Sequence, residues 1–163
     1  MRFWRLAVLM AALVTWCGTS ARAETTLRIG LAEDPDILDP SVGRTYVGRI
    51  VFSAFCDKLF DIDEKLNIVP QLALSYENSS DGKEMTIKLR PGVKFHDGEP
   101  FDAEAAKFSL ERHLTLPTSF RKPELAALDH VDVVDPLTIK LVLKTPYSPL
   151  IAQLTDRAGM MVS

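Results

Sequence analysis

Cysteine is scarce in this sequence of 163 residues, which contains only two. Cys17 lies in the N-terminal leader described below, so only Cys56 is expected in the exported chain. A single cysteine excludes an internal disulfide. Because no histidine or second cysteine lies close to Cys56 in the sequence, we interpret it as a small apolar side chain that packs rather than reacts.

Motifs of catalysis and metal binding are also lacking. His96, His113 and His130 fall in three different predicted elements, and there is no H-E-x-x-H motif, nucleophile elbow or glycine-rich phosphate loop. The sequence therefore predicts no catalytic residue, no metal site and no cofactor. A small secreted hydrolase that uses His96 and Asp97 is a weak alternative, because nothing nearby supplies a nucleophile and Asp97-Gly98 is typical of a turn.

The longest apolar run, residues 6–16, has 11 residues and is too short for a bilayer, which needs about 20. Arg2 and Arg5 precede this run, and Ala21-Arg22-Ala23 follows it as an A-x-A cleavage site. We therefore predict a signal peptide over residues 1–23, with cleavage after Ala23. A lipoprotein anchored through Cys17 is disfavoured, because Trp16 is larger than the small residue that usually precedes a lipidated cysteine.

Excess positive charge is absent from the predicted mature chain. The leader holds three arginines and no acidic residue, so residues 24–163 carry 16 basic and 22 acidic side chains and a net charge of −6. This balance argues against a nucleic-acid partner or an anionic membrane surface. It suits an exported protein that does not insert into the membrane after signal cleavage.

The most informative stretch spans residues 79–112. Residues 79–82 form a turn, Met85, Ile87 and Leu89 give the alternation of a half-buried strand, and a second turn covers residues 96–100. Asp102 is the expected N-cap of a helix whose apolar face continues through Leu110.

Periodicity predicts the remaining elements with less detail. Strands are expected at residues 26–32 and in hairpins over residues 59–69 and 129–144, with a brief helical turn at residues 70–73. A helix over residues 44–58 should bury Val47, Ile50, Val51, Ala54 and Phe55. Residues 150–155 should start a short helix, and residues 159–162 should start a strand.

The order of strand, turn, HDG turn and capped helix resembles the family 5 extracytoplasmic solute-binding proteins, the peptide- and nickel-type receptors of bacterial ABC importers. The matching residues are Asp81, Gly82, Leu89, Arg90, Gly92, Val93, Lys94, Phe95, His96, Asp97, Gly98, Pro100, Phe101 and Ala103. Asp102 stands where the family often has Thr, and Ala105 where it often has Asp; both keep a helix start.

The resemblance implies an α+β fold of the periplasmic binding protein type II kind, limited to its N-terminal part. Residues 24–43 would form the first strand and cleft loop of lobe I, residues 44–157 the small α+β subdomain, and residues 158–163 the truncated start of a return strand. The second lobe would be absent. By position, Glu33 and Asp34 would face the ligand at the end of the first strand.

The resemblance also implies a periplasmic receptor that closes on a peptide or small organic solute and delivers it to an inner-membrane permease and ATPase complex. Nickel is disfavoured because the sequence has no metal cluster. A chain limited to this part should be marginally stable and bind solute weakly. The alternative is a standalone exported α+β interaction module that captures no solute.

Overall fold

The computed structural model describes residues 26–163, so the predicted signal peptide and its cleavage site lie outside the described residues. The chain divides into a short N-terminal unit ending at Gly30 and a unit spanning residues 31–163. Residues 26–32 form no strand, and Leu27 and Ile29 are exposed. The predicted strand at 26–32 is therefore wrong for this structure. A strand requires a pairing partner, and the described residues supply none to this segment.

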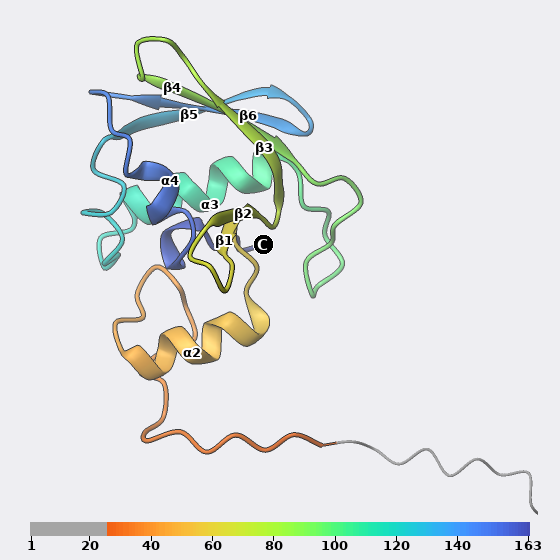
Figure 1. Ribbon diagram of the computed structural model, residues 1–163. Helices are drawn as coiled ribbons and strands as arrows, with labels where there is room; N and C mark the ends of the chain where they lie inside the picture. The colour runs from red at the N-terminus through yellow and green to blue at the C-terminus, as the bar shows by residue number, and fades with distance from the viewer. Residues whose placement is uncertain (1–25) are drawn as a thin grey trace, which may run out of the picture. The chain divides into compact units, whose positions relative to one another are not determined.

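Four antiparallel strands form the central sheet of the larger unit, in the order β3-β4-β6-β5 (Figure 1). Their bounds are β3 Ala73–Asn78, β4 Glu84–Leu89, β5 Leu128–Asp135 and β6 Thr138–Leu143. Strand β4 pairs with β6 in the register Met85↔Leu141 and Ile87↔Ile139. All four of these side chains are buried, so the predicted alternation is confirmed.

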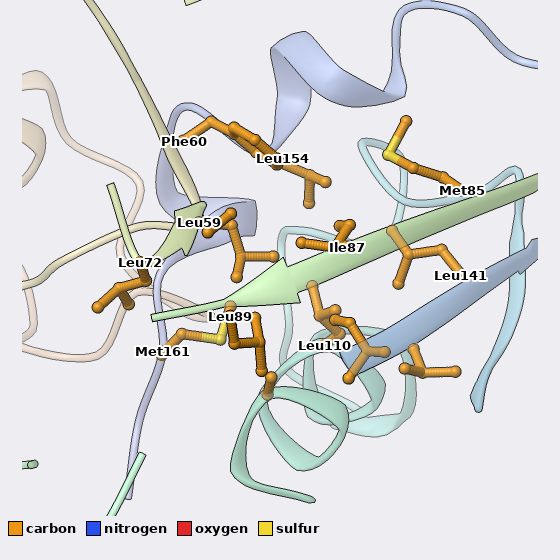
Figure 2. Close-up of a cluster of buried hydrophobic side chains, with 14 of the residues drawn as sticks. Leu59, Phe60, Leu72, Met85, Ile87, Leu89, Leu110, Leu141, Leu154 and Met161 are labelled. Atoms are coloured by element: carbon orange, nitrogen blue, oxygen red, sulfur yellow. The ribbon is translucent and has the colours of Figure 1, made fainter. Parts of the chain in front are cut away.

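Helix α3 (Ala103–Thr115) contributes to the same core. The Asp102 carboxylate accepts a hydrogen bond from the Ala105 amide at 2.9 Å, which is the predicted N-cap. Leu110 lies beside β4 and β6, among the buried side chains that Figure 2 shows. One face of α3 is therefore buried in the hydrophobic core.

A two-stranded hairpin, β1 (Phe60–Ile62) and β2 (Ile68–Pro70), precedes the sheet as predicted. The helical turn predicted for residues 70–73 is wrong. Pro70 ends β2 and Ala73 begins β3, because the amides of residues 71 and 73 both donate to the Leu59 carbonyl. These long-range bonds replace the local bonds of a helical turn.

Helix α2 spans Tyr46–Phe55, shorter than the predicted 44–58, and Thr45 is its N-cap. Its buried face consists of Val47, Gly48 and Phe52, whereas Ile50 and Phe55 are exposed. The predicted apolar stripe is therefore only partly correct. A Cβ placed on Gly43 would lie 2.8 Å from the Phe52 ring. Because Gly43 has no side chain, the Phe52 ring can pack closely against the loop before α2. The helix therefore buries the face that carries Phe52 and not the face that carries Ile50.

The chain ends with α4 (Leu150–Gln153) and the 3₁₀ helix η2 (Arg157–Gly159). Residues 159–162 form no strand; the predicted strand start is reduced to an isolated antiparallel bridge between Lys58 and Met160. The Leu59 amide donates to the Gly159 carbonyl at 2.9 Å, and the Met161 amide donates to the Asp57 carbonyl at 3.3 Å. Residues 57–59 and 159–161 therefore lie side by side.

Within residues 26–163, no helix combines the length and apolar character needed to cross a membrane.

Candidate functional site

The predicted ligand residues, Glu33 and Asp34, lie in an exposed loop that leads to α2. Their side chains make no hydrogen bond or ion pair to any other residue of the described range 26–163. The other two acidic residues of this loop, Asp36 and Asp39, are both bonded within the protein. The structure therefore separates four neighbouring carboxylates into two that organise the loop and two that are open to solvent.

Asp36 fixes the start of α2. Its carboxylate accepts hydrogen bonds from the Arg44 amide at 2.9 Å and from the Thr45 hydroxyl at 3.0 Å. The bond from the Arg44 amide is the main cause that lowers the pKa of Asp36, because it stabilises the ionised form. The loop is thereby closed back onto the helix that follows it.

Asp39 ties the loop to α3. Arg112 binds its carboxylate through both terminal nitrogens, Nη1 at 3.1 Å and Nη2 at 2.6 Å. The hydrogen bond from Arg112 lowers the pKa of Asp39. Paired bonds of this kind fix the relative orientation of the two side chains as well as their distance. This contact therefore fixes the position of Asp39 against α3.

Ser41 and His113 make a second, fully buried contact between the loop and α3. The Ser41 hydroxyl lies 2.9 Å from His113 Nδ1, and His113 Nε2 lies 3.3 Å from the Met160 carbonyl. Burial lowers the pKa of His113 to about 4, so the ring is neutral at pH 7. A neutral ring has one donor and one acceptor nitrogen, which matches these two partners.

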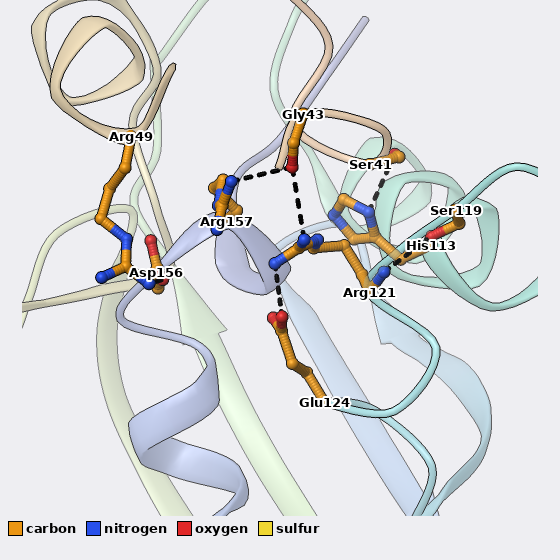
Figure 3. Close-up of polar contacts among 9 residues, drawn as sticks. All are labelled: Ser41, Gly43, Arg49, His113, Ser119, Arg121, Glu124, Asp156 and Arg157. Carbon is orange, nitrogen blue, oxygen red and sulfur yellow. Dashed lines mark hydrogen bonds and ion pairs between the residues drawn. The ribbon is translucent and has the colours of Figure 1, made fainter. Parts of the chain in front are cut away.

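Two buried arginines converge on the Gly43 carbonyl (Figure 3). Arg157 Nη1 donates to this oxygen at 2.8 Å and Arg121 Nη2 at 3.3 Å. Arg121 also pairs with Glu124, whose pKa is raised by burial. The loop segment Asp39–Gly43, with Arg112, His113, Arg121 and Arg157, is named here the loop anchor.

The sequence suggested Glu33 and Asp34 as candidate ligand residues and gave no indication of the loop anchor; the role of Glu33 and Asp34 stays a prediction. The partners that hold the loop follow it by 71 to 114 residues, a separation at which periodicity and spacing carry no information. The residues around Ser41 and Gly43 carry no sequence motif that points to these partners. Only folding brings α3 and η2 against this turn.

Comparison with known proteins gives the evolutionary context of this arrangement. Residues 67–163 match the family of bacterial extracellular solute-binding proteins, family 5. The chain belongs to this family. Family 5 solute-binding proteins of ABC importers are periplasmic and are not enzymes.

Two relatives illustrate the match. The glutathione-binding protein GsiB of Pectobacterium atrosepticum is 39% identical over 127 residues, which cover 77% of this chain and 25% of that protein. The structure of AgaA from A. tumefaciens R10, solved with agropinic acid, is 35% identical with a TM-score of 0.74 and covers 79% of this chain and 26% of AgaA.

A nickel ABC transporter protein from Bacillus halodurans is 34% identical with a TM-score of 0.68, over 79% of this chain and 26% of that one. The chain therefore spans about a quarter of the length of the family 5 relatives that it matches. The predicted α+β, type II binding-protein fold is confirmed for that quarter, and the remaining part of those structures has no counterpart in the 163 residues.

Because the chain belongs to family 5, whose members are not enzymes, the alternative prediction of a small secreted hydrolase is wrong. His96 and Asp97 form a turn in which the Asp97 carboxylate accepts from the Glu99 amide at 3.1 Å. Cys56 lines a small neighbouring cavity of about 70 Å³, and burial raises its pKa to about 11, so its thiol is protonated. No metal-binding cluster of His, Cys, Asp and Glu occurs among residues 26–163.

Proposed function

We propose that this chain is the N-terminal part of the periplasmic solute-binding component of an ABC importer for peptides or similar small organic solutes. The observation that carries the proposal is the anchored loop with two open carboxylates, Glu33 and Asp34, beside two carboxylates that are bonded internally. A loop held at several points can present side chains in fixed positions without being part of a helix or strand.

The chemistry of the relatives' ligands supports an organic solute with a cationic group. GsiB is named for glutathione, a tripeptide that carries an ammonium group. AgaA was solved with agropinic acid, which supports a small organic solute but not the cationic group. Two carboxylates suit an ammonium because opposite charges attract, and this attraction strengthens when closure of a binding site removes the surrounding water. The absence of a metal-binding cluster among residues 26–163 favours such a solute over a nickel ion.

The proposed mechanism is a shift between two conformations. A solute that contacts Glu33 and Asp34 on one side and a second lobe on the other binds the closed form more tightly than the open form, and so raises the closed population. An inner-membrane permease and ATPase complex would then recognise the closed form. The predicted signal peptide, cleaved after Ala23, would deliver the chain to the periplasm.

The test uses the protein as the native host exports it, with its intact mass measured first. Calorimetric titration with glutathione and with dipeptides should give binding, and the double variant Glu33→Gln/Asp34→Asn should weaken it by ten- to a hundredfold. Glu64→Gln/Glu77→Gln removes the same charge from exposed positions on the β1–β2 turn and β3 and should leave affinity within twofold. Equal affinity in both double variants would refute the assignment.

One observation favours a second candidate, a standalone exported α+β interaction module. Tyr46 and Ile50, on the face of α2 turned away from the core, are 73% and 38% exposed. They line a groove of about 500 Å³ that also includes Ile62 and Met160. An intact mass equal to residues 24–163, together with no solute binding, would select this function over solute capture.

A further inference from the structure

Three separate sets of contacts hold the five residues Asp39–Gly43, and each comes from a distant part of the chain. Arg112 binds Asp39, His113 binds Ser41, and Arg157 and Arg121 bind the Gly43 carbonyl. The Phe120 amide adds a bond of 2.8 Å to the Ser41 carbonyl. Every contact except this last one uses a side chain, so single substitutions can remove them.

The hydrogen bonds through Ser41 have only one consistent direction. A carbonyl oxygen accepts only, so His113 Nε2 donates to Met160 and Nδ1 of the neutral ring accepts from the Ser41 hydroxyl. A guanidinium donates only, so Arg112 donates to the same hydroxyl oxygen. A chain of hydrogen bonds that runs from Arg112 through Ser41 and His113 to the Met160 carbonyl therefore links the loop, α3 and the residues after η2.

Two buried arginines donate to the Gly43 carbonyl, although one donor would satisfy this oxygen. Arg121 and Arg157 are 4% and 7% exposed, and the Nε atom of each is buried without a hydrogen-bond partner among the described residues. Arg121 is also paired with Glu124, but burying two guanidinium groups at one carbonyl still costs desolvation free energy that a single neutral donor would avoid. In some proteins, buried ionic groups of this kind select one conformation over its neighbours.

We propose that Ser41, His113 and Arg157 are positioning residues for solute binding, which hold Asp39–Gly43 in the arrangement that directs Glu33 and Asp34 toward the solute. This inference rests on the proposed function. The three residues are buried, so they act on the solute through the loop and make no contact with it themselves. Their loss should loosen the loop while the sheet and α3 remain folded.

The test measures hydrogen exchange and solute affinity in the natively exported protein. Ser41→Ala and Arg157→Met should accelerate exchange at least tenfold at the amides of residues 41–44, which are hydrogen-bonded in this loop, and leave β4 amides unchanged. Both variants should weaken affinity about tenfold. Arg157→Lys, which keeps a donor for Gly43, should recover most of that loss. Ser53→Ala, on exposed α2, is the matched control for Ser41→Ala.

The outcomes separate this inference from the proposed function. Weaker binding by both Glu33→Gln/Asp34→Asn and Arg157→Met, with rescue by Arg157→Lys and selective loop exchange, supports both. Weaker binding by the acidic double variant alone overturns the positioning role and leaves the proposed function standing. Faster loop exchange without any change of affinity also overturns the positioning role, and so does uniformly faster exchange across β4, because the residues would then be structural only.

Discussion

At the scale of single residues, proton uptake by His113 is linked to folding. In the native protein its pKa is about 4, against 6.5 for an unperturbed histidine, because the ring is buried and lies near Arg112 and Arg121. Between these two values the unfolded chain binds a proton that the native protein does not. The contribution of His113 is therefore complete above about pH 7 and is lost as the pH falls from 6.5 to 4.

This linkage predicts a pH-dependent free energy of unfolding. The value should fall by about 3 kcal/mol between pH 7 and pH 4, and His113→Gln should lack most of that dependence. The carboxylates with lowered pKa values, such as Asp36 and Asp39, add to this fall only below about pH 5, where the unfolded carboxylates begin to bind protons, so the slope between pH 7 and pH 5 reports His113. Urea denaturation at half-unit pH steps measures the effect. An unchanged slope in His113→Gln would contradict the prediction.

At the scale of elements, α3 depends on a cap that its own sequence provides. Asp102 has extended backbone angles and its carboxylate bonds the Ala105 amide, while Phe101 before it is buried in the core. Because the helix carries both the core residue Leu110 and the anchoring pair Arg112 and His113, its first turn determines where the loop anchor lies.

We expect Asp102→Ala to lower the free energy of unfolding by about 1 kcal/mol, since an amide of the first turn then loses its acceptor. Asp102→Asn keeps an acceptor oxygen and should cost less than half of that amount. Chemical denaturation of the three proteins measures both differences. The exposed helical residue Glu104, substituted to Ala, is the control for general loss of acidic charge near the helix start. Equal losses in Asp102→Asn and Asp102→Ala would argue against the cap.

The elements also mark the limit of what the sequence could predict. The alternation in β4, the Asp102 cap and the β5–β6 hairpin were all predicted correctly, because each depends on residues close in sequence. The strand at residues 26–32 was predicted wrongly and the buried face of α2 only in part, because each depends on the residues that pack or pair against it. The loop anchor was missed for the same reason: nothing near Gly43 indicates that Arg121 and Arg157 will reach it.

At the scale of the whole molecule, apolar surface is left uncovered. Tyr46 and Ile50 on α2 and Ile62 on β1 border one groove, and Leu27 and Ile29 are separately exposed in the N-terminal unit. Contiguous exposed apolar surface promotes association between copies of a protein.

A polypeptide of residues 24–163 should therefore self-associate at micromolar concentration and bind the dye ANS. Tyr46→Gln/Ile50→Gln should reduce both effects, because it makes one wall of the groove polar. Sedimentation velocity and dye fluorescence provide the measurements. Phe108→Gln, which removes an exposed aromatic side chain from α3 outside this groove, is the control and should change little. A monomeric wild-type polypeptide without dye binding would contradict the expectation.

The bridge between Lys58 and Met160 has a consequence for how this region can be exchanged between proteins. Because residues 57–59 and 159–161 are paired, the chain leaves the hairpin, sheet and α3 within about 5 Å of where it entered them. A segment whose ends meet can be replaced by another of different length without moving what lies outside it. Recombination or design could therefore exchange residues 58–160 between related proteins at these two points, provided that the replacement also supplies partners for Asp39–Gly43, which side chains of this segment hold.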